Sequence, residues 1–120
     1  MDKLPKAQEQ IMQAIWKIEK GFLKDIIEAL PKPKPHPNTV STLLKILVEK
    51  KFVGIKNAGR FHEYYVLIPK SAYKDNSIRS LVEGYFDGSF SSAVSYMVNS
   101  KKLSIKDLEL LLKEIKKDKR

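Results

Sequence analysis

The sequence contains no cysteine among its 120 residues, which excludes disulfide bonds, thiolate metal sites and cysteine nucleophiles. It also lacks an apolar run of the roughly 20 residues that a membrane-spanning helix needs, so we expect no membrane insertion. The two histidines, His36 and His62, are too few to hold a transition metal without relying mainly on carboxylates. We therefore expect a cytoplasmic protein that carries no metal and no other cofactor.

The signatures of common enzymes are missing as well. There is no phosphate-binding Walker loop, no dinucleotide-binding glycine motif and no serine-hydrolase elbow. No pair of acidic residues has a spacing that suggests glycoside chemistry. The sequence therefore predicts that the chain is not an enzyme.

Positive charge is present in excess. Lys and Arg total 23 against 14 acidic residues, which gives a formal net charge of +9. The excess is concentrated between Lys20 and Arg60, where nine basic residues stand against only Asp25, Glu28 and Glu49. This balance indicates a polyanionic partner, and nucleic acid, an anionic membrane and simple solubility all remain open at this point.

Helical periodicity predicts three helices in the first part of the chain. After Pro5, apolar residues recur at helical spacing until Gly21 ends the first helix. A second helix is predicted over residues 22–30 and a third over residues 37–51, which Pro37 can open. The proline-rich segment between them cannot be helical, because each proline moves its predecessor out of the α region.

The third predicted helix has two faces of different chemistry. One face carries a complete apolar stripe, which is expected to enter the core: Val40, Leu43, Leu44, Leu47 and Val48. The opposite face carries mostly short polar side chains in place of the usual Glu and Lys: Asn38, Ser41, Thr42 and Lys45. That face is either a neutral exposed surface or a surface selected for hydrogen bonding.

Period-two alternation follows this helix and predicts a β-hairpin. Residues 52–56 form its first strand, Asn57 to Arg60 its turn, and residues 61–68 the returning strand. Three helices followed by a hairpin with a basic tip make a winged helix-turn-helix, in which the third helix is the recognition helix. The N-terminus of that helix is expected to direct backbone N–H groups toward phosphate, and the wing is expected to hold the adjacent backbone.

From Ser77 onward the sequence predicts three further amphipathic helices, the last starting at a capping box of Ser104 and Asp107. Some 40 residues are too few to bury these apolar faces unaided, so the helices pack either on the winged helix of their own chain or on a second copy. The self-contained core of the first domain favours the second copy. The predicted fold is mostly α with a small β-hairpin: a winged-helix DNA-binding domain over 1–70 and a helical dimerisation region over 71–120. The predicted dimerisation residues are Ile78, Leu81, Val82, Phe86, Phe90, Val94, Leu108, Leu111, Leu112 and Ile115.

Four segments of the chain, taken in order, match a recognisable sequence pattern. Residues 38–53 follow a T-V-x-T-x-L-x-x-L-x-x-K-G-hydrophobic pattern, and residues 14–16 provide a helix ending in Trp. Residues 63–66 with Pro69 give an aromatic wing strand, and residues 81–89 an aromatic–Gly joint. In this order, over almost the whole chain, they resemble the penicillinase-repressor family, the BlaI, MecI and CopY type of winged-helix regulators.

The resemblance implies a homodimeric repressor that binds a palindrome in double-stranded promoter DNA. Lys51 departs from the pattern, which has Gly there, and Ile46 stands where several members have Arg. The cysteines of the copper-responsive branch are absent, which excludes copper sensing through thiolates. Together with the polar helix face and the basic wing, the resemblance gives these DNA-binding residues: Asn38, Thr39, Ser41, Thr42, Lys45, Lys56 and Arg60.

The resemblance also implies a route to induction. In the family that the chain resembles, the antibiotic-responsive members are substrates of a membrane sensor-protease pathway. It cuts an Asn-Phe bond in the helix after the glycine joint. Counted from Gly88, the matching pair and candidate proteolytic site is Tyr96 and Met97, with an aromatic residue in place of Asn. Met97 equally fits the apolar stripe that begins at Phe90, so a packing role is the alternative interpretation.

Two other functions remain open from the sequence alone. The polar helix face could dock another protein, which would make the winged helix an assembly module. The positive charge could also belong to a non-specific basic nucleic-acid binder. The short polar side chains and the separate C-terminal helices favour DNA binding over assembly, and sequence preference would separate a specific regulator from a non-specific binder.

Overall fold

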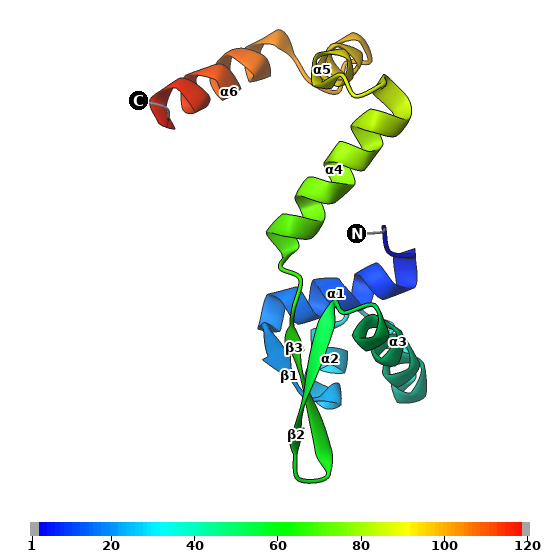
Figure 1. Ribbon diagram of the computed structural model, residues 1–120. Helices are drawn as coiled ribbons and strands as arrows, with labels where there is room; N and C mark the ends of the chain where they lie inside the picture. Colours follow the sequence, from blue (N-terminus) through cyan, green and yellow to red (C-terminus); the bar gives the residue numbers. More distant parts are fainter. Residues whose placement is uncertain (1–2, 119–120) are drawn as a thin grey trace. The chain divides into compact units, whose positions relative to one another are not determined.

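The computed structural model describes residues 3–118, which form six helices and a three-stranded antiparallel sheet (Figure 1). None of these helices has the length and apolar character needed to cross a membrane. Internal contacts divide the chain into two compact units, one up to Asn76 and one from Ser77 onward. In chain order the elements are α1 (Lys6–Ile18), β1 (Lys20–Gly21), α2 (Leu23–Ala29), α3 (Pro37–Glu49), β2 (Val53–Ala58), β3 (Phe61–Val66), α4 (Lys70–Phe86), α5 (Phe90–Asn99) and α6 (Ile105–Asp118).

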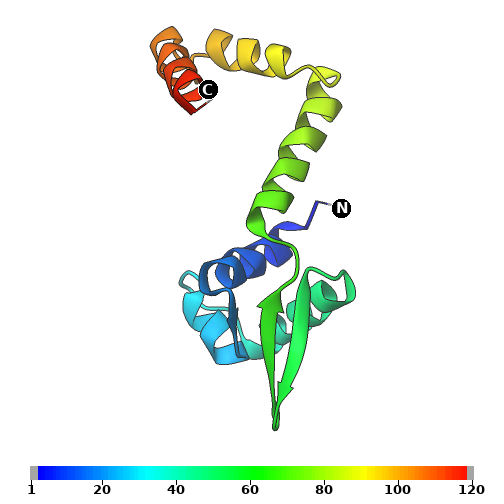
Figure 2. The ribbon, with the colours of Figure 1, turned by 60° about the vertical axis from the view of Figure 1, so that its left-hand side comes forward.

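The first unit is a winged helix-turn-helix, as the sequence predicts. Helices α1, α2 and α3 pack around one apolar core, and the β2–β3 hairpin extends past them in both views (Figures 1 and 2). The side chains with the least exposure come from all three helices and from β2, so the base of the hairpin shares the helical core. They are Ile11, Met12, Ile15, Ile26, Val40, Leu44, Leu47 and Val53.

The sheet contains a third strand that the sequence does not predict. Lys20 and Gly21 of β1 pair antiparallel with Tyr65 and Tyr64 of β3, which gives the strand order β1-β3-β2. A strand of two residues is too short to show alternation, so only its partner reveals it.

The hairpin turn is also tighter than predicted. Strand β2 continues to Ala58, which pairs with Phe61, and only Gly59 and Arg60 remain in the turn. Gly59 has a φ of +66°, and a two-residue type II′ turn favours Gly at this first position. The predicted four-residue turn was therefore too long by two residues.

Helix α4 begins at Lys70, whereas the sequence predicts a return to helix only at Ser77. The additional turns carry Tyr73, which is 5% exposed and belongs to the core of the first unit. Its ring packs against Trp16 and Phe52, with centroid distances of 5.4 and 5.8 Å. The prediction failed because this stretch carries one apolar anchor and no apolar stripe.

The second unit contains the end of α4 with α5 and α6. Among its described residues only Val82 and Ala93 are buried. The capping box at the start of α6 is confirmed, since the N–H of Asp107 donates to Ser104 Oγ at 3.0 Å and the N–H of Ser104 donates to Asp107 Oδ2 at 3.2 Å. The unit therefore has well-defined helices and a very small core.

Candidate nucleic-acid interface

The outer face of α3 presents the polar residues that the sequence predicts for DNA contact. Its exposed side chains are Asn38, Thr39, Ser41, Thr42 and Lys45. On the opposite face, Val40, Leu44 and Leu47 are completely buried. The predicted separation of the two faces is confirmed, so a substitution on the polar face leaves the core unchanged.

The N-terminus of α3 is closed by His36. The Nδ1 atom of His36 accepts the N–H of Asn38 at 3.0 Å, and its carbonyl oxygen accepts the N–H groups of Thr39 and Val40 at 3.0 and 3.2 Å. Pro37 has no N–H to offer. These N–H groups therefore have partners within the chain, and the expectation that they point at phosphate stays a prediction. The sequence did contain a signal for the cap, because His36 directly precedes a proline at the first helical position.

One hydroxyl of the polar face is already engaged. Thr42 Oγ1 donates its hydrogen to the carbonyl oxygen of Asn38 at 2.9 Å, one turn earlier in α3. Thr42 can still accept a hydrogen bond, and its methyl group can contact an apolar base edge. Lys45 is the only cation on this face, which makes it the side chain suited to a strong acceptor such as guanine O6 or N7.

A small cleft links α3 to the wing. Ser41 of α3 and Arg60 at the wing tip both line this cleft, which has a volume of about 180 Å³. The fold thus brings two predicted site residues from distant parts of the sequence to one surface. Lys56 is exposed on β2 and does not line this cleft.

Phe61 is a feature of the wing that the sequence analysis did not single out. It is 68% exposed, and its ring meets Phe22 edge-on at a centroid distance of 6.3 Å. With Leu23 and Lys24, these two rings line an apolar cavity of about 490 Å³. The contact ties the wing to the start of α2. In the sequence, this contact could have been suspected from the aromatic residue directly after the turn, where a polar residue is usual.

Two lysines of the basic segment have structural partners. Lys34 Nζ donates to the carbonyl oxygens of Glu28 and Leu30, each at 2.6 Å, and so caps the end of α2. Lys50 Nζ donates to Gln8 Oε1 at 2.6 Å. The exposed cations on α2, α3 and the wing are Lys24, Lys45, Lys56 and Arg60.

The chemistry of this surface is hydrogen bonding and fixed positive charge. Within residues 3–118, no group of three or more His, Asp or Glu side chains is placed to hold a metal ion. Burial raises the pKa of the Tyr64 hydroxyl above its ordinary value of 10.0, so Tyr64 stays neutral at physiological pH.

The predicted dimerisation residues differ in exposure. Val82 is 3% exposed and packs within its own chain, while Phe86, Val94 and Leu108 are half-buried. The others are between 45% and 54% exposed: Ile78, Leu81, Phe90, Leu111, Leu112 and Ile115. Five large apolar side chains outside this set are also exposed: Tyr85, Tyr96, Met97, Ile105 and Leu110.

The candidate proteolytic site lies inside α5. Tyr96 is 54% exposed and Met97 is 37% exposed. The ring of Tyr96 packs against Phe86 at a centroid distance of 5.7 Å.

Comparison with known proteins gives a consistent result. A family model described as penicillinase repressor matches residues 4–117. The methicillin resistance regulatory protein MecI of Staphylococcus aureus (strain N315) is 27% identical over 110 residues, which cover 91% of this chain and 89% of that protein. The penicillinase repressor of Bacillus licheniformis is 28% identical over 127 residues, covering 100% of this chain and 99% of that protein. A solved structure of the CopR repressor is 26% identical and gives a TM-score of 0.47, covering 56% of this chain and 99% of its own.

Proposed function

The chain belongs to the penicillinase-repressor family of DNA-binding transcriptional repressors, and we propose that it acts as a homodimer on a palindromic operator. The resemblance found in the sequence is confirmed by the family match over residues 4–117. Because the family consists of regulators, the prediction that the chain is not an enzyme is confirmed as well.

The observation that carries the dimer proposal is the exposed apolar surface of the second unit. Its described residues bury only Val82 and Ala93, while eleven large apolar side chains between Ile78 and Ile115 are exposed. Exposed apolar surface on this scale marks an interaction site, because its removal from water is favourable. A second copy offers a complementary partner through two-fold symmetry, and a two-fold dimer matches the symmetry of a palindrome.

We further propose that α3 enters the major groove and that the wing contacts the phosphate backbone. Support comes from the exposed polar face Asn38, Thr39, Ser41, Thr42 and Lys45, opposite a buried apolar face. The cleft shared by Ser41 and Arg60 is where a backbone adjacent to the groove would pass. Lys56 and Arg60 then supply affinity that does not depend on sequence.

The proposal is tested by footprinting the full-length protein on the promoter region beside its own gene, combined with light scattering. We expect one protected palindrome, with half-sites about one helical turn or a multiple of it apart, and a dimer at micromolar concentration. A monomer, both free and on DNA, would contradict the homodimer. Equal affinity for unrelated duplexes would favour a non-specific binder, and no affinity for duplex DNA would favour an assembly module.

For induction, we propose that Tyr96 and Met97 serve helix packing and are not a cut site of a membrane sensor-protease pathway. The carbonyl oxygen of Tyr96 accepts the N–H of Ser100 at 2.9 Å, so the peptide bond between Tyr96 and Met97 is held in hydrogen-bonded helix. A protease that needs an extended substrate would first have to unfold this turn.

Mass spectrometry of the protein recovered from cells exposed to a β-lactam tests this assignment. We expect an intact chain on a derepressed promoter. Fragments that end at Tyr96 would contradict it. In that case cleavage would act by removing the helices that follow, which lowers operator affinity through lost avidity.

A further inference from the structure

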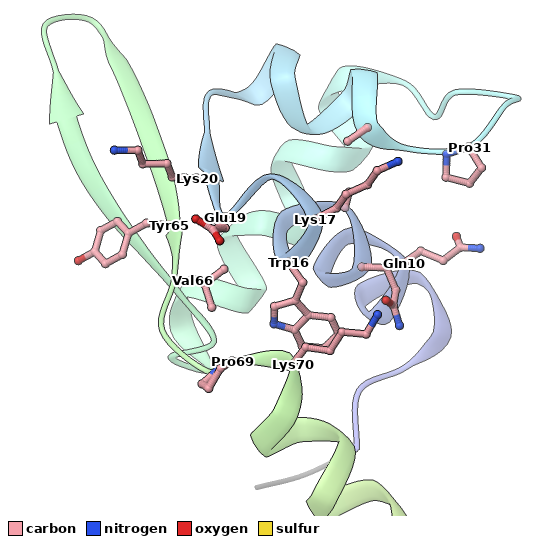
Figure 3. Close-up of a pocket in the computed structure, with 13 residues that line it drawn as sticks. Gln10, Trp16, Lys17, Glu19, Lys20, Pro31, Tyr65, Val66, Pro69 and Lys70 are labelled. Carbon is pink, nitrogen blue, oxygen red and sulfur yellow. The ribbon is translucent and has the colours of Figure 1, made fainter. Parts of the chain in front are cut away.

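The first unit contains a groove that shares no residue with the candidate DNA interface. It has a volume of about 790 Å³ and is lined by α1, β1, the end of α2, the base of β3 and the start of α4 (Figure 3). This volume lies within the range of about 300–1,000 Å³ that is typical of small-molecule sites.

Trp16 provides a fixed aromatic surface in this groove. Its Nε1–H donates to the carbonyl oxygen of Ile68 at 2.9 Å, and its ring packs against Tyr73 at a centroid distance of 5.4 Å. The indole is half-buried, so part of it remains open to the groove. The lining also contains the aromatic ring of Tyr65, and the remaining apolar lining residues are small or compact: Ala14, Ala29, Pro31, Val66 and Pro69. Such a surface favours a flat apolar group, because no side chain has to be reordered to receive it.

The rim of the groove is positively charged. Lys17, Lys20 and Lys70 come from three different elements and lie at different points of the lining in Figure 3, whereas Glu19 supplies the only carboxylate of the lining. The lining therefore carries three positive charges against one negative charge. All four side chains are exposed, which lets the ammonium groups move toward a bound anion.

We propose that this groove binds a small aromatic carboxylate, with its ring against Trp16 and its carboxylate among the ammonium groups of Lys17, Lys20 and Lys70. The aromatic surface selects the ring, and the charge of the rim selects the anion. The site is independent of the proposed function, since none of its residues belongs to the polar face of α3 or to the wing tip.

The sequence offers a direct probe, because Trp16 is the single tryptophan of the chain. The full-length protein is titrated with phenylacetate, and Trp16 fluorescence and calorimetric heat are followed together. We expect a saturable change with a dissociation constant on the order of 1 mM. Phenylacetamide, which has the ring without the charge, and acetate, which has the charge without the ring, should each bind at least several-fold more weakly.

Two variants test the charged rim. Lys17→Gln and Lys70→Gln should each weaken phenylacetate binding by roughly two- to fivefold, because each removes one exposed charge partner. Lys24→Gln makes the same change in the same unit outside the groove and should leave binding unaltered. The proposal is overturned if phenylacetate gives no saturable signal up to about 10 mM. It is equally overturned if the amide or acetate binds as well as phenylacetate, or if all three variants behave alike.

Discussion

Lys51 occupies a backbone position at which a side chain is unfavourable. Its φ is +66°, its N–H donates to the carbonyl oxygen of Val48 at 3.0 Å, and the N–H of Phe52 donates to that of Leu47 at 3.0 Å. This pair of hydrogen bonds is the Schellman motif, which usually ends in Gly because Gly lacks a Cβ. The Gly that the family pattern has at this position therefore has a conformational reason.

We expect Lys51→Gly to stabilise the protein by about 1 kcal/mol, because it removes the cost of the left-handed conformation. Lys51 is exposed, so few contacts are lost. Urea unfolding measures the change. Lys51→Ala is the matched control, since it removes the charge and keeps the Cβ. An equal gain in both variants would attribute the effect to relief of charge repulsion instead of backbone conformation.

Lys45 tests the polar face of α3. We expect Lys45→Ala to weaken operator binding by about 1–3 kcal/mol, with little change in binding to unrelated DNA, if its ammonium contacts a base edge. Thermal stability should hardly change, because Lys45 is exposed opposite the buried Val40 and Leu44. An equal loss of affinity for the operator and for unrelated DNA would instead indicate that Lys45 contacts phosphate. An unchanged operator affinity would show that Lys45 does not contact DNA.

At the scale of elements, one aromatic contact joins the outer part of the wing to the start of α2. Phe61 packs edge-on against Phe22, although it is 68% exposed. We expect Phe61→Ala to lower DNA affinity by about 1 kcal/mol, because the hairpin loses the contact that holds it beside α2. Phe61→Tyr keeps the ring and should restore binding. Gel-shift titrations of both variants measure the effect, and wild-type affinity in Phe61→Ala would show that the wing needs no such support.

The first turns of α4 are held by Tyr73. Its hydroxyl donates to Glu9 Oε2 at 2.7 Å and accepts the N–H of Leu4 at 2.9 Å. Tyr73→Phe removes both hydrogen bonds and leaves that N–H without its partner, so we expect a loss of about 1–3 kcal/mol in the free energy of unfolding. Tyr85→Phe serves as the control, because Tyr85 is 80% exposed and should tolerate the change. Equal stability of the two variants would contradict the anchoring role.

The elements that the sequence predicts well are those whose signal is contained in their own residues. Helix α3 has a complete apolar stripe, and the hairpin has Gly59 between two segments that contain β-branched and aromatic residues. Strand β1 and the start of α4 depend on distant partners, Tyr64 and Tyr65 for the first and Trp16 for the second. A local pattern cannot contain such a partner, which is why both were missed.

The same distinction applies to the candidate site. The polar face of α3 was predictable, because helical spacing alone places Ser41 and Lys45 opposite the core. The contact of Phe61 with Phe22 and the cleft shared by Ser41 and Arg60 required the fold itself. The cap formed by His36 was predictable in part. Its position before a proline can be read from the sequence, whereas its hydrogen bonds require the structure.

At the scale of the whole molecule, we propose that DNA recognition and dimerisation belong to different parts of the chain. The first unit has its own core, and the second has little core and much exposed apolar surface. If the second unit joins two copies, binding of one copy to its half-site holds the other copy close to the second half-site. Binding to the second half-site is then intramolecular, and overall affinity rises without any new contact to DNA. The two units should then be separable by truncation.

We expect a fragment that ends at Asn76 to fold, to be monomeric, and to bind a palindrome roughly 10²–10⁴-fold more weakly than the full chain, because avidity is lost. The fragment must extend past Pro69, because Tyr73 completes the core of the first unit. A shorter fragment that ends at Pro69 should be markedly less stable, which makes it the control for the boundary. Light scattering and operator titration of both fragments decide the question. A fragment to Asn76 that still dimerises, or that binds the palindrome as tightly as the full chain, would place the pairing surface in the winged helix itself.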